Sequence, residues 1–185
     1  GQQPQFHRGL PSMKRLSKET MVFRQYLPAF GRMILLERDF TIRRGSRLYA
    51  KLLVCKNKES LRQLWSKAGI GSLPRGTCGA VNYLRVVRER INREGEVTRR
   101  IDEYDRRYFC VIGLVGDRLT QEVIVHESVH AGFAYAARTS GANYSRSRAV
   151  EMDDELVCHP AGRIAAIVTG ILYRAGFIHG RSQAT

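Results

Sequence analysis

The middle of the chain contains two histidines and a glutamate, in the run His126-Glu127-Ser128-Val129-His130. On an α-helix, side chains four residues apart project from the same face, so these two imidazoles can share one cation at an ordinary Zn–N distance. The Glu127 carboxylate points beside the pair, where it can accept a proton from a water held by the metal. A zinc ion lowers the pKa of that water and polarises a carbonyl group. The spacing therefore predicts a zinc site that hydrolyses a peptide bond.

The pattern fixes only three positions, so its surroundings have to support it. Here it follows a long apolar run and falls inside a helical pattern, where a catalytic helix can lie beneath a sheet. Two histidines at this spacing can also be ordinary core or surface residues of a helix. The zinc interpretation competes with that simpler one.

A catalytic zinc needs a third protein ligand and one open position. The densest acidic run of the chain begins 21 residues after His130 and contains Glu151, Asp153, Asp154 and Glu155, with His159 close behind. A helix that returns after the polar segment 139–152 can bring this run to the first helix. The same run also suits the solvated start of a helix, because acidic residues are favoured near helix N-termini.

Apolar and β-branched residues fill positions 33–42 and 48–55, and Arg43-Arg44-Gly45 separates them, which indicates a β-hairpin. Asn57 or Ser60 can cap a helix that runs to about Ala68, with Gly69 placed to end it. Residues 80–87 read as another strand. Residues 89–107 are strongly charged, with a turn signal at Gly95, and are expected to be solvated.

Residues 108–115 form an uninterrupted apolar run, which is typical of a strand buried on both faces. A helix capped by Thr120 then runs to about Arg138, and a last helix ends before Gly176. This order of elements predicts an α+β fold with a short mixed sheet packed on the histidine-bearing helix and on a C-terminal helix. We expect residues 1–20 to form a basic arm and residues 21–185 a single domain.

The formal charge of +14 is unevenly placed: residues 1–100 hold 22 Lys/Arg against 7 Asp/Glu, and residues 101–185 hold 9 against 10. A basic first half attracts anionic partners, so nucleic acid is a candidate partner beside a protein or peptide substrate. The four cysteines form no CxxC pair, and Cys55 and Cys110 lie in apolar runs, which favours a reducing compartment. The longest apolar stretch, residues 164–173, is too short for a membrane span.

The segments HESVH and DDELVCHPAGRIAAIVTGILYRAGF resemble the two-helix core of gluzincin-type zinc metallopeptidases. They are especially similar to small HExxH metallopeptidase-like proteins encoded by phages and prophages, and the resemblance covers residues 108–177. It implies a zincin-like domain with Zn²⁺ as cofactor, His126 and His130 as metal ligands and Glu127 as general base. It implies Glu155 as the third ligand, with Asp154 as the alternative.

Pro160 complicates this assignment, because proline removes a backbone N–H and clashes inside a helix. If the last helix begins at Pro160, then Glu155 lies in the turn before it and His159 becomes a rival ligand. The resemblance implies a protein of the bacterial or phage-infected cytoplasm, or of a virion. Three other functions remain open. One is a basic nucleic-acid-associated protein with a structural or vestigial metal site, and another is an assembly protein without turnover. The third is a protease recruited to nucleic-acid-bound substrates, which the resemblance to the ImmA/IrrE and SprT types of small HExxH protein suggests.

Overall fold

The structure is a computed structural model, and it describes residues 31–68, 70–92, 97–140 and 154–179. The predicted arm of residues 1–20 and most of the predicted loop 139–152 lie outside these ranges. The described residues form an α+β fold, as the sequence predicts.

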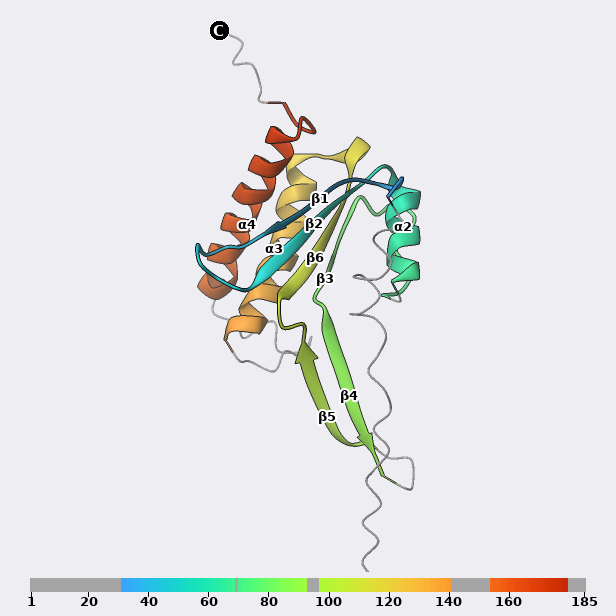
Figure 1. The fold of residues 1–185 in the computed structure, drawn as a ribbon, viewed down its shortest axis with the longest axis vertical. Helices are drawn as coiled ribbons and strands as arrows, with labels where there is room; N and C mark the ends of the chain where they lie inside the picture. Colours follow the sequence, from blue (N-terminus) through green and yellow to red (C-terminus); the bar gives the residue numbers. More distant parts are fainter. Residues whose placement is uncertain (1–30, 69, 93–96, 141–153, 180–185) are drawn as a thin grey trace, which may run out of the picture.

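Four strands form the main sheet, which has the spatial order β1-β2-β6-β3 (Figure 1). β1 and β2 are joined as the predicted antiparallel hairpin, β2 runs parallel to β6, and β3 runs antiparallel to β6. The sheet is therefore mixed, and β1 and β3 are its two edges. The strands comprise β1 (Ile34–Phe40), β2 (Tyr49–Cys55), β3 (Gly79–Asn82) and β6 (Tyr108–Val115).

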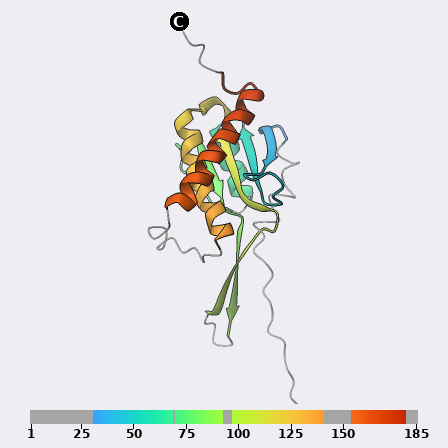
Figure 2. The ribbon, with the colours of Figure 1, turned by 90° about the vertical axis from the view of Figure 1, so that its left-hand side faces the viewer.

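Helices cover both faces of the main sheet. α2 (Lys58–Lys67) lies on one face, and α3 (Gln121–Thr139) and α4 (Asp154–Arg174) lie antiparallel to each other on the other (Figures 1 and 2). A short 3₁₀ turn, η2 (Gly116–Arg118), connects β6 to α3. The histidine-bearing segment is thus held on a helix that starts directly after the central strand.

Strand β6 is buried along its whole length, as its continuous apolar run predicts. Successive side chains point to opposite faces, so Cys110, Ile112 and Leu114 join the core under α3 and α4. Val111 and Val115 join a second core, which lies under α2 and contains Trp65. Two separate hydrophobic cores therefore fix the position of β6 and, through η2, the start of α3.

Three helix ends follow the predicted signals, whereas Gly69, the residue expected to end α2, lies outside the described residues. The Asn57 side chain accepts a hydrogen bond from the Ser60 N–H at the start of α2, and Thr120 accepts one from the Val123 N–H at the start of α3. α4 ends at Arg174, and Gly176 follows with φ +76°, a conformation that glycine adopts without strain. Local sequence determines these boundaries.

The predicted strand 80–87 is divided in two, and the charged segment 89–107 contains paired strands, while its predicted turn at Gly95 lies outside the described residues. Leu84 has φ +47°, which turns the chain between β3 and β4 (Arg85–Ile91). β4 pairs antiparallel with β5 (Val97–Tyr104), and this two-stranded ribbon projects away from the main sheet (Figure 1). The backbone groups of β4 and β5 are hydrogen-bonded to each other by strand pairing. The charge pattern of the sequence does not predict that pairing.

Helix α4 begins at Asp154 and contains Pro160 in its interior, so the alternative start at Pro160 is wrong. Burial of Val157, Ala161 and Ile164 outweighs the local cost of the proline, which is about 3 kcal/mol. Among the described helices, only the segment Glu155–Arg174 is long and apolar enough to cross a membrane. That property is weak evidence, because core helices of soluble proteins share it.

Candidate metal centre

The two histidines of α3 face each other on its exposed surface. The Nε2 atoms of His126 and His130 lie 3.2 Å apart, and the ring centroids are 4.8 Å apart. Both side chains are exposed, so solvent and a ligand can reach them. The helix thus brings together the two imidazoles that the sequence pattern predicts to be neighbours.

The separation of these nitrogens suits a shared zinc ion. Two nitrogens that bind one tetrahedral zinc at about 2.0–2.1 Å lie about 3.3 Å from each other, close to the 3.2 Å between His126 and His130. Burial lowers the pKa of His130, and the neighbouring His126 lowers it further. A neutral imidazole is the form that binds metals, so both geometry and charge state are compatible with metal binding.

Glu127 is only 6% exposed, although His126 before it is exposed, and Ser128 after it is also buried. Burial raises its pKa above the usual value, and the charge of His126 partly opposes this shift. The carboxylate therefore lies on the sheet side of α3, one position from a metal ligand candidate. A raised pKa makes a carboxylate a better proton acceptor near neutral pH.

The Glu127 side chain packs directly against the backbone of Gly79, the first residue of β3. A Cβ atom at position 79 would lie 2.5 Å from Glu127 Cγ and 2.8 Å from its Oε1. Only glycine leaves room for this carboxylate between the helix and the strand. No local pattern predicts this contact, because Gly79 ends a glycine-rich stretch that is typical of an ordinary loop.

Glu155 is not beside the histidines in this arrangement. Its Oε2 lies 2.9 Å from Nε2 of His159, and both side chains are largely exposed, at 73% and 83%. A Cβ on Gly132 would contact Val157 O and Ala161 Cβ, both at 2.9 Å, so Gly132 marks the crossing of α3 and α4.

The position of the helix crossing determines how far Glu155 lies from His130 along the helix axes. His130 lies two residues before Gly132 on α3, whereas Glu155 lies about four residues before the crossing point on the antiparallel α4. At 1.5 Å rise per residue, this places Glu155 roughly 9 Å from His130 along the helix axes. Helical Cβ atoms tilt toward the N-terminus, which carries the two side chains further apart.

The remaining candidates for the third ligand are only partly described. Glu151 and Asp153 lie outside the described residues, and Asp154 is described only as the first residue of α4. In the part of the chain that the structure covers, no three His, Cys, Asp or Glu side chains cluster as a metal site would require. The third ligand therefore stays a prediction.

Hydrolysis of a peptide bond also needs a hydrogen-bond donor for the developing oxyanion, and the candidate donors Tyr135, Tyr144, Tyr173 and His179 differ in their surroundings. Tyr135 is 7% exposed and packs edge-on against Phe109 at 5.2 Å between ring centroids, so it belongs to the core. Tyr173 is 59% exposed in the last turn of α4, His179 is exposed beyond it, and Tyr144 lies outside the described residues. Tyr135 can be removed from this group because its ring is occupied by packing.

No family model matches the chain, and comparisons with curated proteins and with solved structures find no match either. The resemblance to gluzincin-type metallopeptidases therefore stays a prediction from the sequence.

Proposed function

We propose that this protein is a zinc-dependent metallopeptidase whose metal is held by His126 and His130 and whose general base is Glu127. The observation that carries this proposal is the 3.2 Å separation of the two Nε2 atoms on an exposed helix face. The neighbouring carboxylate supports it, because it is buried, has a raised pKa and belongs to the same turn of helix.

Each residue has a separate task in this proposal. A bound zinc ion supplies Lewis-acid chemistry, by making a water more acidic and a scissile carbonyl more electrophilic. Glu127 takes the proton from the water and carries it to the leaving amine. Packing against Gly79 restricts the rotation of the Glu127 side chain, which keeps its carboxylate oriented.

Strand β3 offers a place for an extended substrate. It is an edge of the main sheet, and among the described strands it pairs only with β6. A peptide that adds to this edge as a further strand lies next to Gly79 and so close to Glu127. Because an edge strand can pair with an extended chain, this position favours a peptide substrate over a small, compact one.

The third ligand in this proposal comes from the acidic run that leads into α4. For Glu155 to serve, it must leave His159, and the first turn of α4 must approach His130 more closely. Zinc content separates the candidates: Glu155→Ala loses zinc if the assignment is right. Retained zinc in Glu155→Ala, with loss in Glu151→Ala, Asp153→Ala, Asp154→Ala or His159→Ala, transfers the role to that residue.

The proposal is tested by zinc analysis and by cleavage of an unfolded protein substrate. We expect about one zinc per chain and a loss of activity of about 10²–10⁴-fold in Glu127→Gln with zinc retained. Glu122→Gln, one turn earlier and exposed on the same helix, is the matched control and keeps activity. An unchanged rate in Glu127→Gln would overturn the mechanism.

Substitution of the histidines tests the metal site itself. His126→Ala and His130→Ala lose zinc, whereas His179→Ala, exposed beyond α4, retains it. If wild-type protein binds zinc but cleaves no protein, and binds nucleic acid with an affinity that falls steeply with salt, then the alternative applies: a nucleic-acid-associated protein with a structural metal. The basic excess in residues 1–100 is the observation that favours this alternative.

A further inference from the structure

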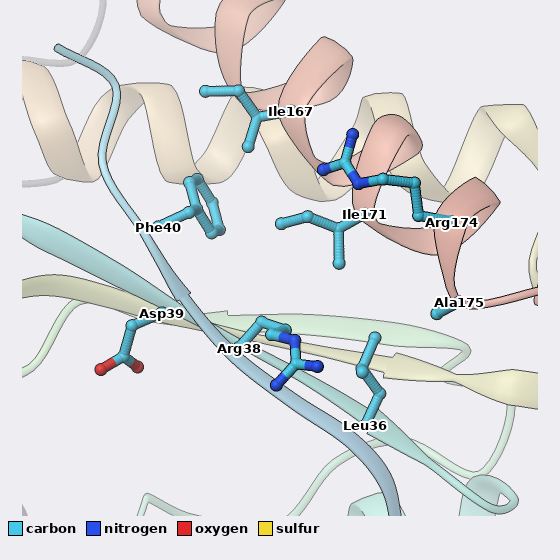
Figure 3. A pocket seen from close by; sticks show the side chains of 8 residues that line it. All are labelled: Leu36, Arg38, Asp39, Phe40, Ile167, Ile171, Arg174 and Ala175. Atoms are coloured by element: carbon cyan, nitrogen blue, oxygen red, sulfur yellow. The ribbon is translucent and has the colours of Figure 1, made fainter. Parts of the chain in front are cut away.

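A groove of about 410 Å³ lies between strand β1 and helix α4 (Figure 3). Strand β1 is the edge of the main sheet opposite β3. Strand β1 contributes alternate side chains that face the helix, Leu36, Arg38 and Phe40. The helix contributes Ile167, Ile171 and Arg174. The groove is remote from the candidate metal centre and has no role in the proposed hydrolysis.

The lining combines an apolar floor with two positive charges. In Figure 3 the apolar side chain of Ile171 lies between Arg38 on the strand wall and Arg174 on the helix wall, with Phe40 to one side. Neither guanidinium has an acidic partner among the described residues. Two cations beside an apolar surface favour an occupant that carries both a carboxylate and apolar groups.

The one acidic residue of the lining is already engaged. Asp39 accepts a hydrogen bond from the Tyr108 hydroxyl at 2.5 Å and lies 2.9 Å from the Lys51 ammonium. Lys51 also contacts Glu37. Asp39 therefore cannot neutralise Arg38 as well, and the groove keeps a net positive charge.

The outer backbone edge of β1 supplies a second binding feature. In the main sheet β1 is the terminal strand and, within the part of the chain that is described, pairs only with β2. An extended peptide can pair with this free edge and place alternate side chains in the groove. Ile167 and Ile171 of α4 line the space above such an added strand.

We propose that this groove binds an extended segment of a partner protein in which an acidic residue is flanked, two positions away on each side, by apolar residues. Residues two apart on a strand share a face. In the register that sets the acidic residue opposite Arg38, the flanking apolar residues lie opposite Leu36 and Phe40. Arg174 adds a second favourable charge from the helix side.

Two other occupants fit the charges less well. In a second copy of the chain, the antiparallel register that pairs Leu36 with Phe40 sets Arg38 opposite Arg38, and like charges directly opposite each other are destabilising. Residues 1–30 hold five Lys/Arg and a single acidic residue, Glu19, whose neighbours two positions away are Ser17 and Met21. That composition does not supply the acidic, apolar pattern.

A binding experiment with synthetic peptides tests the proposal on the full chain. The probe is a fluorescent peptide of about seven residues, the length of β1, with threonine on one face and valine, glutamate and valine on the other. Matched peptides carry glutamine or lysine in place of the glutamate. Fluorescence anisotropy is expected to show affinity lower by about tenfold for the glutamine peptide and by about a hundredfold for the lysine peptide.

Substitutions in the protein localise the effect. Arg38→Glu is expected to reverse the preference, so that the lysine peptide binds best. Arg174→Gln is expected to lower the affinity for the glutamate peptide by less than Arg38→Gln does. Arg75→Glu makes the same charge change in an exposed loop and leaves the order of the peptides unaltered. Arg38 is itself exposed, and circular dichroism confirms that each variant is folded.

Several results would overturn the proposal. Equal binding of all three peptides, or an unchanged preference in Arg38→Glu, would mean that Arg38 only protects an edge strand from pairing with other chains. A dimer that the glutamate peptide does not dissociate would assign the groove to a second copy. Stronger competition by a peptide of residues 1–30 would assign it to this chain's own N-terminal segment.

Discussion

The two edges of the main sheet are covered by the same pair of helices but in different ways. At the β3 edge, α3 approaches so closely that the Glu127 side chain contacts the backbone of Gly79. At the β1 edge, α4 overhangs the strand and leaves an open groove. One edge therefore holds a buried carboxylate in a fixed position, and the other offers a free surface.

The difference follows from the side chains of the two strands. β3 begins with Gly79, which has no side chain and so leaves space for α3 to approach the backbone. β1 presents Leu36, Arg38 and Phe40 toward α4, and these bulky side chains hold the helix away from the strand. Close packing at the β3 edge therefore restricts the Glu127 carboxylate, the general base of the proposed hydrolysis. The groove at the β1 edge leaves room for another chain.

The largest expected effect comes from filling the space at the β3 edge. Gly79→Ala places a Cβ against Glu127, so we expect peptide hydrolysis to fall by about a hundredfold as the carboxylate is displaced. Gly76→Ala, three positions earlier and with nothing near its Cβ, is the matched control and leaves the rate unchanged. Equal rates in the two variants would show that the Gly79 contact does not position Glu127.

A second prediction concerns the contact that holds both helices together. Gly132→Ala forces a Cβ to within 2.9 Å of Ala161 Cβ and Val157 O, so urea unfolding should show a loss of about 1–2 kcal/mol after the higher helix propensity of alanine is allowed for. Gly162→Ala, in open space on α4, should instead stabilise by up to about 1 kcal/mol. Changes of the same sign would contradict the close helix crossing.

The smallest effect is expected at the β1 edge, in Asp39→Asn. Burial disfavours the charged form of Asp39, but hydrogen bonds from Tyr108 and Lys51 and the charges of Lys51 and Arg107 more than offset it, so its pKa lies below the usual 3.8. A lowered folded pKa contributes stability above the unfolded pKa, and this contribution is lost as pH falls through the folded value.

Urea unfolding at several pH values measures this contribution. Asp39→Asn should be less stable than wild type by about 0.5–1 kcal/mol at pH near 7, a modest value because the side chain is partly exposed. The difference should shrink as the pH falls below the usual Asp value of 3.8 and through the lowered pKa of Asp39. Asp117→Asn, at an exposed site on η2, is the control. A difference that stays constant with pH would exclude the charge of Asp39 as its source.

Sequence patterns predicted the parts of the fold that depend on neighbouring residues. The hairpin of β1 and β2, the buried strand β6 and the caps at Asn57 and Thr120 each follow from a short run of side chains. The sequence pattern did not predict the pairing of β4 with β5. A charge pattern indicates solvent exposure, but it does not show which strands lie side by side. The local preference of Pro160 left two possible starts for the last helix, and tertiary burial decided for the earlier one, with Pro160 inside α4.

For the candidate site, the spacing of His126 and His130 on a helix determined that their imidazoles meet, since helical geometry alone places side chains four residues apart on one face. Only the tertiary structure determined that Glu127 is buried against Gly79, and that the crossing of α3 and α4 at Gly132 separates Glu155 from His130 along the helix axes. These contacts join segments that are distant in sequence or set by how α4 crosses α3. Such relations depend on the packing of whole elements, which no local pattern encodes.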